Sequence, residues 1–159
     1  MRLLLDADAL IKLNRAEILV PLFESTECAI PQAVYEEAVV EGHARGYADA
    51  KEIESALKER CSVEEATSSS RLRALGAGDT ALLTLAEVGD ESIVVSDDGP
   101  FLGVLRARGI DYLNCAQLVV YLVRNQVLTA DRASKALGRM QSLISPKSFN
   151  EATEMLDSL

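Results

Sequence analysis

Two short apolar runs of this chain each end in carboxylates. Residues 3–8 have the sequence LLLDAD, and residues 93–98 have the sequence IVVSDD. A continuous apolar run of this length is typical of a buried parallel strand whose last residues emerge at the carboxyl edge of the sheet. Carboxylates gathered at that edge repel one another and lose hydration unless a cation holds them together. The two runs therefore indicate a metal site, and oxygen ligands without Cys or His favour Mg²⁺ or Mn²⁺.

Two further acidic residues lie on predicted helices near the same edge. Glu37 follows the second predicted strand, and Asp79 lies in the first turn of a helix that begins near Gly78. Taken singly, Glu37 also fits a solvated helix face, and Asp79, like Asp6 and Asp8, fits a helix cap. In a right-handed parallel sheet, however, strand ends and helix starts share one face. We therefore expect four acids to converge there: Asp6, Glu37, Asp79 and Asp98.

Turn residues separate alternating strand and helix patterns along most of the chain. The patterns predict strands over residues 2–6, 27–30, 61–64, 92–96 and 110–113. They predict helices over residues 9–20, 32–40, 46–60, 78–87 and 100–108, with a loop at 67–70. The first of these helices is expected to stop at Pro21, and the second at Gly42. The rest of the chain is predicted to be helical, over residues 116–125, 130–143 and a last segment from about 150.

Strands that alternate with helices are typical of an α/β fold. The length of 159 residues fits one such domain. We predict a central parallel five-stranded sheet flanked by helices, with residues 1–114 as its core. Residues 115–159 are expected to form a C-terminal helical extension packed on the same domain.

The composition excludes several classes of protein. The three cysteines are far apart and the chain has one histidine, His43, which excludes an ordinary zinc site and a disulfide framework. The longest apolar stretches are strand-sized, and the run at residues 3–5 ends at Asp6 rather than continuing as a signal peptide. We therefore expect a cytoplasmic protein without a membrane segment.

The charge and the aromatic content limit the kinds of contact with nucleic acid that we expect. A net charge of −9 argues against avid nonspecific binding to duplex DNA. The chain has no Trp and 4% aromatic residues, which argues against a base-stacking platform. Contacts with nucleic acid are therefore expected to be mainly to the backbone, through local groups of basic residues. The candidates are Lys12, Arg15, Arg71 and Arg73.

The sequence resembles the PIN-domain family over roughly residues 1–114. The similar pieces are, in order, LDADALIKL at 5–13, IPQAVYEE at 30–37, LGAGDTALLTLA at 75–86 and VSDDGPFL at 95–102. The resemblance implies a metal-dependent ribonuclease with a parallel sheet of strand order 3-2-1-4-5. It also implies an RNA substrate, Mg²⁺ or Mn²⁺ as the cofactor, and products with 5′-phosphate and 3′-hydroxyl ends.

The resemblance also assigns roles to residues of this chain. It carries the four acids of the family onto Asp6, Glu37, Asp79 and Asp98. If either acidic pair is displaced by one residue, Asp97 would replace Asp98 as a metal ligand, and Glu36 would replace Glu37. Three further residues are expected to support the ligands from beside them: Asp8, at a position where the family often has Ser or Asn, together with Ser96 and Thr80. Asp8 has a second possible role, as an added metal ligand.

Family expectations extend to partners. VapC-like toxins of the family act with antitoxins, so the resemblance implies an antitoxin-like protein partner and a homodimer. The stretch from Cys115 onward is longer than in the compact toxin members. The helical C-terminus offers a surface for either partner.

Two other functions fit part of the pattern. Asp6 and Asp8, with the later doublet, also resemble haloacid-dehalogenase-like phosphatases, in which the first Asp is a phosphorylated nucleophile. That interpretation leaves the Gly78-Asp79-Thr80 motif unexplained. The second alternative is a noncatalytic PIN-like module that binds RNA or protein. Metal-dependent cleavage of a small RNA panel separates the three.

Overall fold

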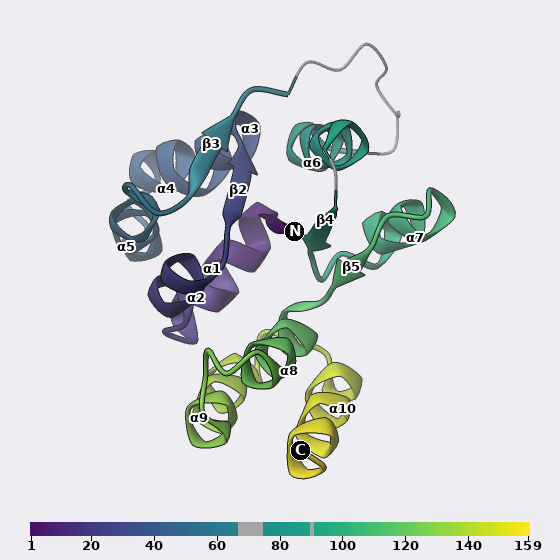
Figure 1. The fold of residues 1–159 in the computed structure, drawn as a ribbon. Coiled ribbons are helices and arrows are strands. Elements are labelled where there is room, and N and C mark those ends of the chain that lie inside the picture. The colour runs from purple at the N-terminus through teal and green to yellow at the C-terminus, as the bar shows by residue number, and fades with distance from the viewer. Residues whose placement is uncertain (67–74, 90) are drawn as a thin grey trace.

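A computed structural model describes residues 1–66, 75–89 and 91–159. Its core is a five-stranded sheet with the order β3-β2-β1-β4-β5, and every neighbouring pair of strands is parallel (Figure 1). This order and direction confirm the predicted α/β sheet. The strands are β1 (Arg2–Leu5), β2 (Cys28–Pro31), β3 (Ser62–Glu64), β4 (Ser92–Val95) and β5 (Tyr112–Leu113).

The first strand occupies the centre of the sheet, between β2 and β4. Its leucines at positions 3, 4 and 5 are fully buried, as expected for a strand covered on both faces. Leu5 lies opposite Val95 in the register of β1 and β4, and the backbone N–H of Asp6 donates to the carbonyl of Val95 at 3.3 Å. The two acidic runs therefore leave the sheet side by side.

Helices cover the sheet and share one buried core with it. Helix α6 packs against β1, β2 and β4, and α7 packs against β5. The N-terminal helix α1 packs against α5 and, at its other side, against α8 and α9. The elements before the C-terminal region are α1 (Ala7–Arg15), α2 (Leu19–Ser25), α3 (Gln32–Tyr35), a π-helical turn η1 (Glu36–Val40), α4 (Glu41–Ala44), α5 (Ala48–Leu57), α6 (Ala77–Val88) and α7 (Gly99–Ala107).

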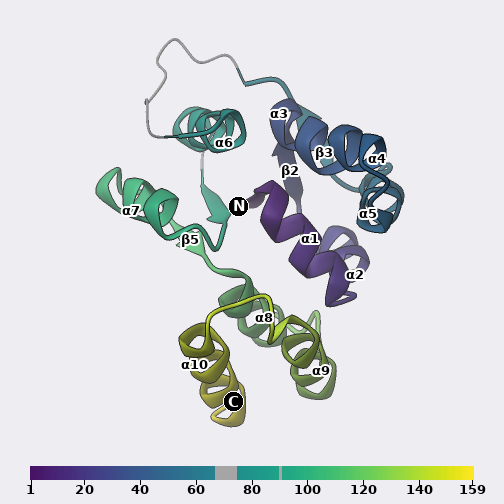
Figure 2. The same cartoon turned by 180° about the vertical axis from the view of Figure 1, so that it is seen from behind.

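The C-terminal region is helical, as predicted, and lies at one end of the molecule (Figure 2). It consists of α8 (Cys115–Arg124), α9 (Ala130–Met140) and α10 (Pro146–Asp157). Helix α8 contacts β5 and α1, and α10 contacts both α8 and α9. Among the described residues, no helix combines the length and the apolarity needed to cross a membrane.

The single helix predicted over residues 9–20 is wrong, because the structure has two helices there. Helix α1 ends at Arg15, and the chain turns through Glu17, which has a φ of 61°. Pro21 then lies in the first turn of α2 instead of ending a helix. A first-turn N–H has no partner within the helix, so proline is tolerated at that position.

The predicted stop at Gly42 is also wrong, because α3, η1 and α4 follow one another without a break to Ala44. Gly42 lies inside α4 and is buried, and a Cβ atom there would be 2.8 Å from the Cβ of Ala50. The glycine therefore serves close packing of α4 on α5 and does not end the helix.

The last helix begins earlier than predicted, at Pro146. Ser145 caps it by accepting a hydrogen bond from the backbone N–H of Ser148, and proline is well suited to the first helical position. The other predicted elements are confirmed, with boundaries that shift by about three residues or fewer. The loop predicted at 67–70 lies outside the described residues.

Candidate active site

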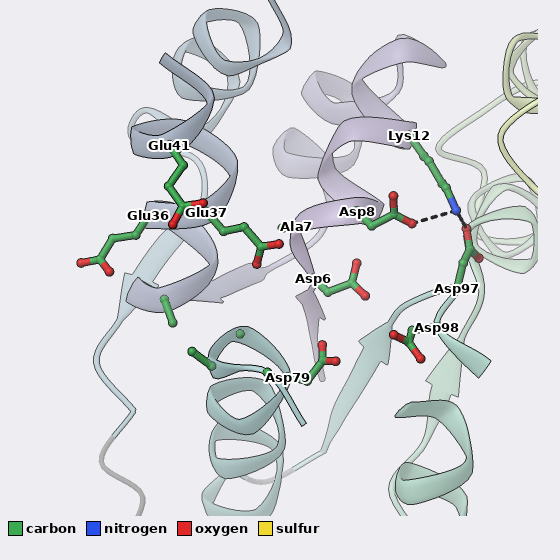
Figure 3. Close-up of a pocket in the computed structure, with 14 residues that line it drawn as sticks. Asp6, Ala7, Asp8, Lys12, Glu36, Glu37, Glu41, Asp79, Asp97 and Asp98 are labelled. Atoms are coloured by element: carbon green, nitrogen blue, oxygen red, sulfur yellow. Dashed lines mark hydrogen bonds and ion pairs between the residues drawn. The ribbon is translucent and has the colours of Figure 1, made fainter. Parts of the chain in front are cut away.

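Carboxylates line a cavity of about 600 Å³ at the carboxyl edge of the sheet (Figure 3). The lining comes from the ends of β1 and β4, helices α1, α3 and α4, the η1 turn and the start of α6. All four acids carried over by the family resemblance are among its lining residues. The charged residues that line it are Asp6, Asp8, Lys12, Glu36, Glu37, Glu41, Asp79, Asp97 and Asp98.

Asp6 is the most deeply buried of these acids, with 6% of its surface exposed. Its Oδ1 caps α1 by accepting a hydrogen bond from the backbone N–H of Ala9 at 2.7 Å. Burial raises the pKa of Asp6 to about 7, against the lowering effect of hydrogen bonds from Ser96 and Ala9. The nearby charges of Asp8 and Asp79 raise this pKa further. The site therefore holds a carboxylate that is costly to ionise without a cation.

Ser96 connects the two strand ends. Its side chain is fully buried, and its hydroxyl is close enough to Asp6 to lower the pKa of that carboxyl. The Oγ of Ser96 accepts a hydrogen bond from the backbone N–H of Asp98 at 3.1 Å. Ser96 therefore holds the backbone of Asp98 in place near Asp6.

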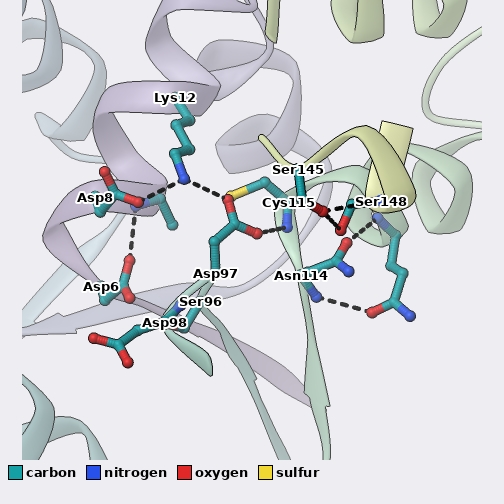
Figure 4. A network of polar contacts seen from close by, with 12 residues as sticks. Asp6, Asp8, Lys12, Ser96, Asp97, Asp98, Asn114, Cys115, Ser145 and Ser148 are labelled. Atoms are coloured by element: carbon teal, nitrogen blue, oxygen red, sulfur yellow. Dashed lines mark hydrogen bonds and ion pairs between the residues drawn. The ribbon is translucent and has the colours of Figure 1, made fainter. Parts of the chain in front are cut away.

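The two acids of the 97–98 doublet have different surroundings (Figure 4). Asp98 caps α7, with its Oδ1 accepting from the backbone N–H of Phe101 at 3.1 Å, and its carboxylate lies at the cavity. Asp97 is held on both oxygens. Its Oδ2 accepts from Lys12 at 2.8 Å, and its Oδ1 accepts from the backbone N–H of Cys115 at 2.9 Å. Asp98 is therefore the freer of the two to bind a ligand.

Lys12 bridges two of the acids. Its Nζ lies 2.8 Å from Oδ2 of Asp8 and 2.8 Å from Oδ2 of Asp97. Burial lowers the pKa of Lys12, but the two carboxylates outweigh it and hold this pKa above its ordinary value. Lys12 thus ties α1 to the end of β4 and, through Asp97, to the start of α8.

The predicted RNA contacts differ in their surroundings. Lys12 is engaged by Asp8 and Asp97, as described above. Arg15 donates through Nη2 to Oδ2 of Asp49 at 3.0 Å. Arg71 and Arg73 lie outside the described residues. All four stay predictions as RNA contacts.

Glu37 lies on the η1 turn, where the helix contains one extra residue per turn. Figure 3 shows Glu37 pointing toward Asp6 and Asp79, whereas Glu36 points away. Turns of this kind are frequent at functional sites. Burial raises the pKa of Glu37, and the charges of Glu41 and Asp8 add to this effect.

Asp79 reaches the cavity from the first turn of α6. The helix brings Gly78 close to Glu37, since a Cβ atom at Gly78 would lie 3.3 Å from Oε2 of Glu37. Burial raises the pKa of Asp79 to about 6, and the charges of Asp98 and Glu37 raise it as well. Thr80, in the same turn, is not among the residues that line the cavity, so its predicted supporting role stays a prediction.

The sequence analysis missed Glu41, which also lines the cavity. Glu41 lies four residues after Glu37, a spacing that places two side chains on one side of a helix. That signal was present in the sequence, but the helix was expected to stop before this position.

The donor types fit a hard divalent cation, since every acidic group at the cavity offers oxygen. Within the described residues, no three His, Cys, Asp or Glu side chains already form a group that could hold a metal ion. The carboxylates share a cavity and influence one another's pKa values, as shown for Asp79 by Asp98 and Glu37. A cation would therefore have to draw these side chains closer together.

We expect Lys12→Met to lower the free energy of unfolding by on the order of 2 kcal/mol, because it leaves Asp97 and Asp8 without their shared cation. Arg15→Met is the matched control on the same helix. Its ion pair with Asp49 is more exposed, so its loss should lower the free energy of unfolding by about 1 kcal/mol or less. Urea unfolding in chelator measures both values, and equal losses would contradict the anchoring role of Lys12.

Comparison with known families places the chain beside a described family. A family model described as a PIN domain matches residues 2–157, a span that includes all of α8, α9 and α10 as well as the sheet. No curated protein matches the chain.

Proposed function

Because this chain belongs to the PIN-domain family, we propose that it is a metal-dependent ribonuclease that hydrolyses RNA phosphodiester bonds at the carboxylate-lined cavity. PIN domains are generally nucleases and typically use divalent metals. One observation carries the proposal: four acids from four separate elements line one cavity at the carboxyl edge of the sheet. They are Asp6, Glu37, Asp79 and Asp98.

In this proposal Asp6, Asp79 and Asp98 hold Mg²⁺ or Mn²⁺, and Glu37 completes the acidic set. When bound, such an ion would lower the pKa of an attacking water and stabilise the charge on the leaving oxygen. The chain itself positions these ligands: the hydroxyl of Ser96, close to Asp6, accepts a hydrogen bond from the backbone N–H of Asp98. No histidine base is required, and we expect products with 5′-phosphate and 3′-hydroxyl ends.

A panel of single-stranded and structured RNAs tests this function. We expect cleavage with Mn²⁺ or Mg²⁺, no cleavage with chelator, and 5′-phosphate ends on the products. Asp98→Asn, purified in parallel, controls for a contaminating nuclease. If the wild type binds RNA but cleaves none of it with either metal, the noncatalytic alternative replaces the proposal. Hydrolysis of a phosphate monoester through a phosphorylated Asp6 would favour the phosphatase alternative.

The family also motivates proposals about partners. We propose an antitoxin-like protein and a second copy of the chain as partners, with the C-terminal helices as the surface. Size measurement of the purified chain, alone and with a candidate partner, tests both.

A further inference from the structure

A second cavity, of about 500 Å³, adjoins the acidic one. Glu37 and Glu41 line both cavities, so the two adjoin at this pair of side chains. The second cavity lies between α1 and the segment that joins α4 to α5, and we call it the flanking groove. A polymer bound across the acidic cavity and leaving past Glu41 would enter this groove.

The flanking groove presents the most exposed aromatic ring of the chain. The chain has three Phe, four Tyr and no Trp, and all seven aromatic residues lie in the described segments. Six of them are buried or half-buried, whereas Tyr47 is 57% exposed and lines the groove. An exposed ring beside a nucleic-acid site offers a stacking surface for one base, because every base has a flat π face.

The backbone holds Tyr47 in place. Its N–H donates to the carbonyl of Gly42 at 2.9 Å, and its carbonyl accepts from the N–H of Ala50 at 3.2 Å. Gly46, directly before it, has a φ of 71°, a conformation that glycine adopts without strain. The ring is thus presented from an ordered turn, which reduces the entropy lost when a base stacks on it.

A basic residue accompanies the ring. Arg45 lines the same groove and is exposed, and it forms no ion pair with the described residues. The acid on the α5 side of the groove, Asp49, is already bonded by Arg15 and Asn14. A phosphate at this end would therefore meet the guanidinium of Arg45 without a competing free carboxylate from Asp49.

We propose that the flanking groove binds the nucleotide next to the cleaved bond of a single-stranded RNA, with its base stacked on Tyr47 and its phosphate held by Arg45. This inference rests on the proposed ribonuclease function. Single strands are favoured because a base must be unpaired to stack on a side chain. The groove then determines which strand form reaches the acidic cavity, and it adds one stacking contact rather than an extended platform.

Binding of fluorescently labelled RNA, measured by anisotropy in the Asp98→Asn background with Mg²⁺, tests the groove without cleavage. We expect Tyr47→Ala to weaken binding of a single-stranded 12-mer by about tenfold and Tyr47→Phe, which keeps the ring, by less than about twofold. Arg45→Ala should weaken binding and reduce the slope of log affinity against log salt by about one. Arg124→Ala, which removes an exposed cation on α8, is the matched control and should change neither.

The result for a duplex of the same sequence completes the test. We expect Tyr47→Ala to leave duplex binding unchanged, because paired bases cannot reach the ring. Unchanged affinity for the single strand in Tyr47→Ala and Arg45→Ala would overturn the proposed role of the flanking groove. Equal losses of affinity for the single strand and the duplex would also overturn it. If the wild type cleaves no RNA but Tyr47→Ala still weakens single-strand binding, the proposed ribonuclease function is wrong. The same result supports binding of single-stranded RNA in the flanking groove. Saturable binding of a basic peptide in place of RNA, lost in Tyr47→Ala, would make the groove a protein site and overturn the proposal.

Discussion

Replacing any one of the four converging acids by its amide is expected to reduce metal-dependent RNA cleavage by about a hundredfold or more, while the chain stays folded. An amide keeps the size of the side chain but removes the charge that binds a divalent cation. Loss of a group that only supports a metal ligand already lowers affinity or activity by about 10–100-fold, so loss of a ligand should cost at least as much. The changes are Asp6→Asn, Glu37→Gln, Asp79→Asn and Asp98→Asn.

Initial rates at saturating RNA, with Mg²⁺ and with Mn²⁺, measure the effect, and circular dichroism verifies the fold. The neighbours in sequence provide matched controls. Glu36→Gln should retain most activity, because Glu36 points away from Glu37 and Asp6. A cleavage rate of Asp6→Asn equal to that of the wild type would contradict the proposed nuclease function.

The adjacent acids Asp97 and Asp98 give a second comparison within the same assay. We expect Asp98→Asn to lower the rate more than Asp97→Asn. The reason is that Lys12 and the N–H of Cys115 already engage both oxygens of Asp97. A larger kinetic loss in Asp97→Asn would mean that the ligand lies one residue earlier than we propose.

The sheet and the acidic set could be predicted because they depend on local pattern and on topology. Apolar runs that end in acids mark β1 and β4. The handedness of parallel sheets then places their ends, and the start of α6, at one edge. The observed strand order and the lining of the cavity agree with that expectation.

The features that could not be predicted depend on tertiary contacts. Nothing in the sequence near Lys12 shows that Asp97, 85 residues later, would bind it. Gly42 has the sequence signal of a helix end but is required by the nearby Ala50. Glu37 lies in the π-helical turn η1, and periodicity alone does not reveal that turn. Local rules fail at these positions because packing between distant segments decides the outcome.

Asp6→Asn is expected to raise the melting temperature of the metal-free protein at pH 8. The pKa of Asp6 is raised from its ordinary value of 3.8 to about 7, chiefly by burial, so the folded state holds this proton more tightly than the unfolded chain. Stability is therefore undiminished below about pH 3.8 and falls as the pH rises toward 7. Above that value the full cost applies, on the order of 4 kcal/mol for a shift of about three pKa units.

The substitution removes this cost without removing the helix cap, because Asn caps helices about as well as Asp. The stabilisation by Asp6→Asn should accordingly be large at pH 8 and nearly absent at pH 4. Asp98→Asn should also stabilise the metal-free protein, since the charge of Asp98 acts against ionisation of Asp79. If Asp6 were only an exposed helix cap without a buried charge, the effect of Asp6→Asn on the melting temperature would be the same at pH 4 and at pH 8.

A bound divalent cation should offset, in the wild type, the loss of stability that ionisation of Asp6 causes. A cation that binds only the folded state adds about 2.7 kcal/mol at a hundred times its dissociation constant. Melting curves of the wild type, Asp6→Asn and Asp98→Asn, each with chelator and with millimolar Mn²⁺, should therefore show a rise for the wild type and a much smaller one for the variants. The contrary result is that the wild type in chelator has the same melting temperature at pH 8 as the two variants, and that Mn²⁺ changes the melting temperature of none of the three. These acids would then be helix caps and surface charges. The metal-dependent mechanism then has no ligands to act through.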